Sequence, residues 1–64
     1  MLIGCYYDDG RALVAEFGRV CELIGKSEYL VRKALNYGKQ IPGVTIVQVP
    51  KNTPLRIPAD CKIR

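Results

Sequence analysis

The sequence predicts a small α+β fold: an N-terminal β-hairpin, a unit of two helices, a third β-strand and an extended, proline-containing C-terminal tail. Three observations favour this fold. Two β-prone stretches flank residues 17 to 37, where apolar residues recur with helical spacing. A Gly-Lys-Ser sequence divides that central segment into two short helical patterns. After Val49, prolines recur at every fourth position, which disfavours a helix in the last part of the chain.

The hairpin is predicted from an apolar run, Leu2 to Tyr7, that ends in the turn sequence Asp8-Asp9-Gly10. Glycine favours such a turn because it tolerates a positive φ. Residues 11 to 17 supply the returning strand, with alternate residues on opposite faces, although residues 12 to 16 also contain good helix formers. Gly18 is predicted to break the chain before the first helix.

The first helix is expected from about Arg19, because the apolar residues that follow fall on one helical stripe. Gly25 ends this helix in a left-handed conformation that carries no Cβ penalty. Ser27 then caps the second helix by accepting a backbone N–H bond. Glu28 in the first turn complements the dipole of that helix.

The second helix has a predicted buried stripe of Leu30, Val31, Ala34 and Leu35. The stripe leaves a second set of side chains largely outside the core: Glu28, Tyr29, Arg32, Lys33 and Asn36. A basic loop containing Lys39 and Gln40 follows. Such an exposed face carries cations and hydrogen-bonding groups that suit nucleic acid, but it also serves simply to keep a small domain soluble.

The third strand is predicted at residues 44 to 49, the most β-prone stretch of the chain. Pro50 bounds it, because proline cannot donate to a strand ladder. We therefore divide the chain into one domain, residues 1–50, and an extended tail, residues 51–64. The tail has three alternatives: it packs on the domain through Leu55 and Ile57, binds a partner chain, or lies loose.

Composition excludes several classes of function. With no histidine in the 64 residues, a Cys/His zinc site and the histidine-dependent triads and dyads are absent from a single chain. Cys5, Cys21 and Cys61 have no close metal-binding spacing, and we expect Cys5 and Cys21 to be buried thiols. Adjacent Asp8 and Asp9 are explained by the turn. The sequence therefore predicts a protein that is not an enzyme and needs no cofactor or metal.

The chain also lacks a long apolar run and a signal-peptide pattern, so we expect a cytoplasmic protein that does not enter a membrane. Its net charge of +4 is unevenly distributed. Residues 1 to 25 hold two basic and four acidic residues, whereas residues 26 to 64 hold eight basic and two acidic ones. The basic excess begins at the break between the helices and favours an anionic partner, most simply nucleic acid.

Several sequence segments together resemble the small helix-turn-helix repeat found beside homing-endonuclease nuclease domains and in phage proteins. They are Tyr6-Tyr7-Asp8-Asp9-Gly10, Phe17 to Ser27, Val31-Arg32-Lys33-Ala34-Leu35, Gly38 and Gly43, and the similarity covers roughly residues 6 to 47. Gly18 and Lys26 depart from that pattern, at the usual N-cap and at a turn position that is often apolar. The resemblance implies DNA binding without cleavage, because no nuclease segment accompanies the repeat.

If the second helix enters the major groove of DNA, its exposed residues have distinct expected roles. Arg32 is placed to contact guanine and Asn36 to read adenine. Ser27, Tyr29 and Lys33 are expected to hold phosphates, while Lys26, Lys39 and Gln40 anchor the backbone beside the helix. The predicted nucleic-acid-binding residues are therefore Lys26, Ser27, Tyr29, Arg32, Lys33, Asn36, Lys39 and Gln40.

These observations predict a small regulator, of phage or mobile-element type, that binds double-stranded DNA and acts in transcription regulation by occupying a site. One recognition helix makes few contacts, so we expect a homo-oligomer, with residues 44 to 49 or the tail as interfaces. The alternative is a protein–protein module, such as a phage-encoded inhibitor or an assembly factor, that docks through a strand edge or the tail.

Overall fold

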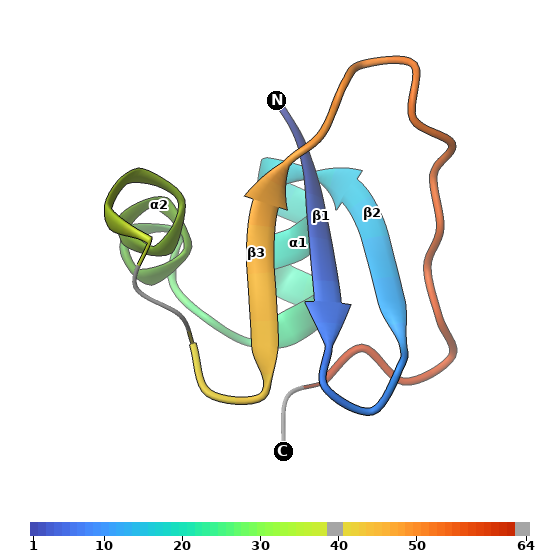
Figure 1. Cartoon of the computed structure of the whole chain (residues 1–64), viewed down its shortest axis with the longest axis horizontal. Coiled ribbons are helices and arrows are strands. Elements are labelled where there is room, and N and C mark those ends of the chain that lie inside the picture. Colours follow the sequence, from blue (N-terminus) through green and yellow to red (C-terminus); the bar gives the residue numbers. More distant parts are fainter. Residues whose placement is uncertain (39–40, 63–64) are drawn as a thin grey trace.

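A computed structural model describes residues 1–38 and 41–62 and places them in a three-stranded antiparallel sheet with two helices (Figure 1). The elements follow in the order β1 (Leu2–Tyr7), β2 (Ala12–Glu16), α1 (Phe17–Ile24), α2 (Glu28–Tyr37) and β3 (Val44–Gln48). In the sheet, β1 lies between β2 and β3. The predicted α+β fold and its order of elements are confirmed.

The N-terminal hairpin forms as the sequence predicts. Strands β1 and β2 pair in a register that sets Gly4 opposite Val14 and Tyr6 opposite Ala12. Gly10 closes the turn with φ of 97°, a conformation that side-chain-bearing residues rarely adopt. The Asp9 carboxylate accepts hydrogen bonds from the Arg11 guanidinium at 2.8 and 3.0 Å, and this raises the Arg11 pKa.

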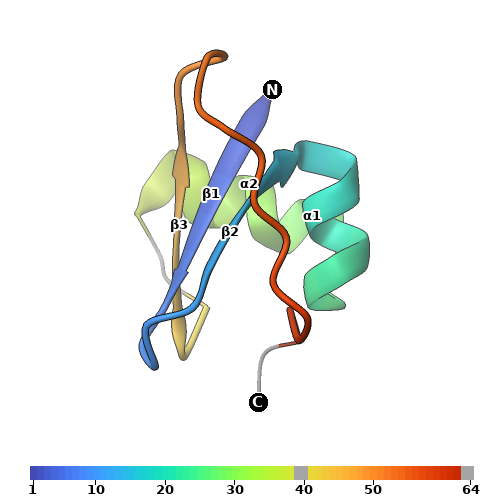
Figure 2. The ribbon, with the colours of Figure 1, turned by 90° about the vertical axis from the view of Figure 1, so that its right-hand side faces the viewer.

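The core lies between the sheet and the two helices. Helix α1 runs behind the sheet and is seen between β3 and β1, whereas α2 lies beyond β3 (Figures 1 and 2). Every second residue of the strands points into this core, which also takes one stripe from each helix. Its largest fully buried side chains are Ile3, Cys5, Leu13, Val20, Val31 and Val44. Helix α2 therefore has one side anchored in the core and another side free.

The first helix begins earlier than the sequence indicates. Helix α1 starts at Phe17, and Gly18 lies inside its first turn, so the predicted break at Gly18 and the predicted start near Arg19 are wrong. Phe17 packs partly buried against the core, which favours turning the chain into a helix at this point. Glycine at this position costs some conformational entropy but breaks no backbone hydrogen bond of the helix.

The tail folds back along the outer edge of β2 (Figure 2). The amide of Val14 donates to the Arg56 carbonyl at 2.7 Å, and the Arg56 amide donates to the Val14 carbonyl at 3.0 Å. Leu55 and Ile57, which the sequence suggested as packing residues, are instead 69% and 52% exposed. The tail therefore attaches at this point through its backbone, and its flanking apolar side chains face outward.

A second attachment fixes Asp60 and Cys61 of the tail to the hairpin. The Tyr7 hydroxyl donates to the Cys61 carbonyl, and the Cys61 side chain is buried in the core. Arg11 donates to the Asp60 carbonyl at 2.5 Å and lies 3.6 Å from the Asp60 carboxylate. Its guanidinium carbon also lies 4.3 Å from the centre of the Tyr7 ring. The tail is thus part of the packed structure.

Burial changes the acidity of the groups around this attachment. All three cysteines are buried and unpaired, which confirms the expectation for Cys5 and Cys21. Burial raises the pKa of Cys5 from 9.0 to about 11, with Cys21 and Cys61 adding to the effect. Burial also raises the pKa of Tyr7 from 10.0 to about 12. The folded state therefore favours the neutral forms of both groups.

Alkaline pH is expected to lower the stability of the fold. Below about pH 9 the Cys5 thiol is protonated in both the folded and the unfolded chain, so its contribution is complete. Between about pH 9 and pH 11 the unfolded chain loses this proton first, and the free energy of unfolding falls. Denaturant titrations across this range measure the slope. In a Cys5→Ala variant the free energy of unfolding should fall less steeply with pH. A slope equal to that of wild type would contradict the role given to Cys5.

Candidate nucleic-acid interface

The hinge between the helices has the chemistry that the sequence predicts. Gly25 adopts φ of 71° and ψ of 29°, and its amide donates to the Cys21 carbonyl at 3.1 Å. The Lys26 amide donates to the same carbonyl at 3.2 Å. Ser27 is extended, and its hydroxyl oxygen accepts the Leu30 amide at 3.3 Å. The left-handed end of α1 and the serine cap of α2 are both confirmed, and they fix where α2 begins.

The two helix glycines should respond oppositely to alanine. Gly25→Ala is expected to lower the free energy of unfolding by about 1 kcal/mol, because an L-residue resists the left-handed conformation. Gly18→Ala is expected to raise it by about 0.5–1 kcal/mol, since this residue has helical backbone angles and open space around its Cα. Urea denaturation measures both variants. Changes of the same sign in the two variants would contradict this account of the hinge.

Helix α2 buries a narrower stripe than the sequence indicates. Val31 and Ala34 are buried and Leu35 is partly buried, but Leu30 is 44% exposed, so its placement in the core was wrong. The adjoining helix α1 is short, and Leu30 lies in the first turn of α2, close to the hinge. The exposed face of α2 is therefore wider and partly apolar.

The exposed face of α2 forms a hollow of about 530 Å³, which we term the outer hollow; its lining residues are Tyr29, Arg32, Lys33, Asn36 and Tyr37. All five come from one helix. Tyr29, Lys33 and Tyr37 follow one another at intervals of four residues and form one ridge along the helix. Arg32 and Asn36 form the neighbouring ridge. Amide, ammonium, guanidinium and phenol groups are thus presented side by side.

The two cations of the outer hollow rest beside aromatic rings. The Lys33 ammonium lies 5.6 Å from the centre of the Tyr29 ring, and the Arg32 guanidinium lies 5.3 Å from the centre of the Phe17 ring. Neither cation belongs to an ion pair among residues 1–38 and 41–62. Contacts with ring faces orient a cation without neutralising it. Both charges therefore stay available to an anionic ligand.

The structure brings together four of the eight predicted site residues. Tyr29, Arg32, Lys33 and Asn36 all line the outer hollow. Lys26 and Ser27 lie apart from it at the hinge, and the Ser27 oxygen already accepts the helix-capping bond. Lys39 and Gln40 lie outside the described residues. The site therefore extends along α2 from its first turn to its last turn.

Sequence reasoning did not include Tyr37 in the predicted site. This residue is 72% exposed, and Tyr29 is 69% exposed at the other end of the hollow. The signal was present in the sequence, because Tyr37 follows Lys33 by four residues and so shares its side of the helix. The two tyrosines frame the cations along the length of α2.

Other kinds of site find little support in the described part of the chain. Residues 1–38 and 41–62 contain no group of three or more cysteine and carboxylate side chains arranged to hold a metal ion. Neither described helix has the length and apolar character needed to cross a membrane.

Comparison with protein-family models, with curated proteins and with solved structures found no match to this chain. The residues of the outer hollow, and the hinge that positions them, are therefore the features that indicate a function.

Proposed function

We propose that this chain is a small, non-enzymatic DNA-binding protein that occupies double-stranded DNA through α2. It acts as a phage or mobile-element regulator of transcription in the cytoplasm. The outer hollow carries the proposal, because one helix face presents two unneutralised cations, an amide and two exposed tyrosines. Arginine and asparagine are suited to guanine and adenine edges, and lysine and tyrosine to phosphates.

The arrangement of the helices supports the same proposal. The hinge holds α2 against the core through Val31 and Ala34 while its opposite side stays exposed. A helix braced in this way is able to enter a major groove as a unit. Because one helix makes few base contacts, a homo-oligomer would supply a second recognition helix and extend the site.

An electrophoretic mobility shift with random-sequence duplex DNA tests the proposal. We expect retardation at low salt that weakens steeply at moderate salt, because cations that bind phosphates release counterions. Light scattering on the same samples gives the oligomeric state. Absence of any shift at low salt would refute DNA binding.

A second candidate function is a protein–protein module, such as a phage-encoded inhibitor or an assembly factor. It is favoured by the two apolar side chains that the tail displays, Leu55 and Ile57. They flank Arg56, whose backbone is fixed to β2, so they project from a rigid segment. In this case a Leu55→Ser and Ile57→Ser variant would lose the partner, whereas variants of the outer hollow would keep it.

A further inference from the structure

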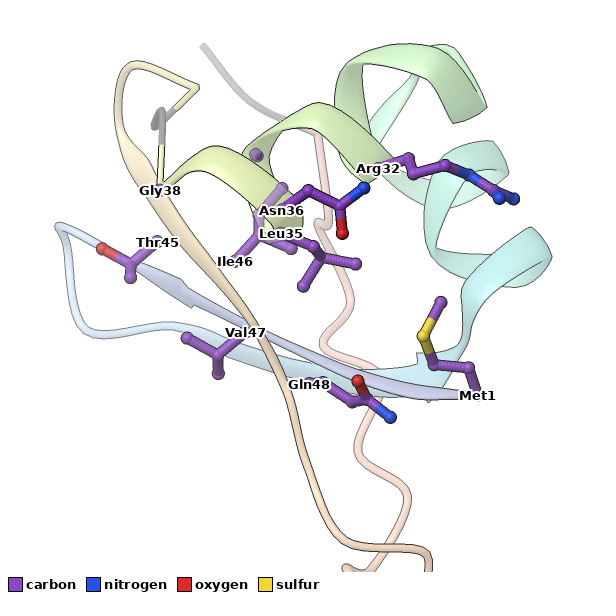
Figure 3. Close-up of a pocket in the computed structure, with 10 residues that line it drawn as sticks. Met1, Arg32, Leu35, Asn36, Gly38, Thr45, Ile46, Val47 and Gln48 are labelled. Atoms are coloured by element: carbon purple, nitrogen blue, oxygen red, sulfur yellow. The ribbon is translucent and has the colours of Figure 1, made fainter.

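The sheet has two edge strands, β2 and β3, and the outer edge of β3 borders a groove. Strand β3 pairs only with β1, and its other edge faces α2 across a space of about 540 Å³ (Figure 3). We term this space the β3 groove; it is lined by Met1, Arg32, Ala34, Leu35, Asn36, Gly38, Thr45, Ile46, Val47 and Gln48. Arg32 and Asn36 line both the β3 groove and the outer hollow. The β3 groove lies on the side of these two residues that faces β3.

The hydrogen bonds of β3 show which of its backbone groups face this groove. The Val49 amide donates to the Leu2 carbonyl at 3.1 Å, and the Asp8 amide donates to the Gly43 carbonyl at 3.0 Å. In an antiparallel ladder, residues that bond to the partner strand alternate with residues that face away. The amides and carbonyls of Ile46 and Gln48 therefore point away from β1, toward the groove.

The two edges of the sheet differ in whether another segment pairs with them. The tail covers β2 through the paired backbones of Val14 and Arg56. Within the described part of the chain, no strand pairs with the outer edge of β3. Proteins commonly protect such an edge with proline or lysine, or cover it with a helix. Val44–Gln48 contains neither residue, and α2 lies across the β3 groove from this edge. The unpaired edge is therefore a template for one further strand.

Charge distinguishes the two ends of the β3 groove. Arg32 lies toward Gln48 and Met1, whereas Gly38 lies toward Thr45 (Figure 3). The lining side chains include no carboxylate that would neutralise Arg32. At the Gly38 end, the last carbonyls of α2 carry partial negative charge. One end of the groove thus favours an anionic group and the other a cationic group.

We propose that the β3 groove binds an extended peptide segment of a protein partner as a fourth strand of the sheet. The peptide runs antiparallel to β3, which is the more stable pairing. In that direction its N-terminal end lies near Arg32 and carries a glutamate or aspartate, and its C-terminal end lies near Gly38 and carries a lysine. Main-chain hydrogen bonds to Ile46 and Gln48 supply affinity. The charges at the two ends of the peptide select its antiparallel orientation.

Chemical-shift mapping with the peptide acetyl-Glu-Val-Thr-Val-Thr-Lys-amide tests the site on the ¹⁵N-labelled whole chain. We expect the Ile46 and Gln48 amides to shift and to exchange with solvent at least fivefold more slowly. A peptide with the two charged residues exchanged should bind about tenfold more weakly. A third peptide is N-methylated at its two valines and two threonines, which removes their backbone N–H donors. This peptide should not bind, and the control requires no change to the protein.

A pair of variants separates the backbone contact from the side chain. Gln48→Pro removes an outward donor and breaks no bond to β1, so we expect at least tenfold weaker peptide binding. Gln48→Ala keeps the donor and should bind like wild type. Lys33→Ala, outside the groove, should weaken DNA binding and leave peptide binding unchanged, so failure of one proposal is distinguishable from failure of the other.

Three results would overturn the proposal. The first is unchanged Ile46 and Gln48 amides at millimolar peptide, and the second is equal binding of the N-methylated peptide. The third is concentration-dependent protection of the same amides without peptide, which would show that a second copy of the chain occupies the edge.

Discussion

Replacing Arg32 and Lys33 together by alanine is expected to weaken binding to duplex DNA by about 10-fold to 100-fold. These are the two cations of the outer hollow, and neither is neutralised by an ion pair among the described residues. Each lost side chain should also remove about one phosphate contact. The slope of log affinity against log salt concentration should therefore become shallower by about 1 for each side chain. Fluorescence anisotropy with a labelled duplex across a salt series measures both effects.

The matched control removes the same charge from another surface. Lys51 and Lys62 are exposed in the tail, and alanine at both positions lowers the net charge equally. This control variant should bind DNA within about twofold of wild type if α2 makes the contacts. The control variant should melt close to wild type, because both of its lysines are exposed, and substitutions at exposed sites change stability by about 0.5 kcal/mol or less. The α2 variant should lose at most about 1–2 kcal/mol, since Lys33 is partly buried and both cations contact aromatic rings. Equal weakening by the two variants would indicate nonspecific charge attraction.

Truncating the chain after Pro54 is expected to destabilise the whole domain. It removes the backbone pair between Val14 and Arg56, the buried Cys61 side chain and the acceptor of the Tyr7 hydroxyl. Together these losses should cost about 2–4 kcal/mol. A core of this size supplies only about 3–5 kcal/mol, so much of the truncated protein should be unfolded at 37 °C. Thermal unfolding followed by circular dichroism measures the loss.

Two variants calibrate that result without shortening the chain. Tyr7→Phe deletes only the hydroxyl that donates to the Cys61 carbonyl, and should cost about 1–2 kcal/mol. Leu55→Ser with Ile57→Ser changes exposed side chains and should leave the melt almost unaltered. A truncated chain that melts like wild type would mean that the tail contributes nothing to stability. Because truncation perturbs the fold, the two serine substitutions are the cleaner test of a protein partner.

The sequence was most informative where one residue type satisfies one backbone requirement. Gly25 and Ser27 predict the hinge because few residues adopt a left-handed cap or accept an N-terminal helix amide. Gly10 predicts the hairpin turn for the same reason. The strand pattern also located β3, since Val44 and Ile46 share the buried face while Val47 is exposed.

Residues whose environment depends on distant parts of the chain could not be placed from the sequence. Gly18 suggested a break and a helix start near Arg19, but packing of Phe17 against the core starts the helix two residues earlier. Leu30 matched the apolar period of α2, yet α1 is too short to cover it. The attachment of Cys61 to Tyr7 joins residues 54 positions apart, and no local pattern encodes it.

Part of the candidate site was likewise accessible from local spacing. Helical periodicity places Tyr29, Arg32, Lys33 and Asn36 on one face, and all four line the outer hollow. The same periodicity includes Tyr37, which the predicted site omitted. The β3 groove needed the sheet order and the position of α2, which depend on the packing of the whole domain.

Chemical-shift mapping of the ¹⁵N-labelled protein with a short duplex tests most directly whether α2 binds DNA. We predict that the largest changes in amide shifts fall on residues 26 to 38, with the side-chain resonances of Arg32 and Asn36 among them. Residues of the tail and of β2 should change little. Shifts that are absent at low salt, or that concentrate in the tail or along β2, would contradict the account.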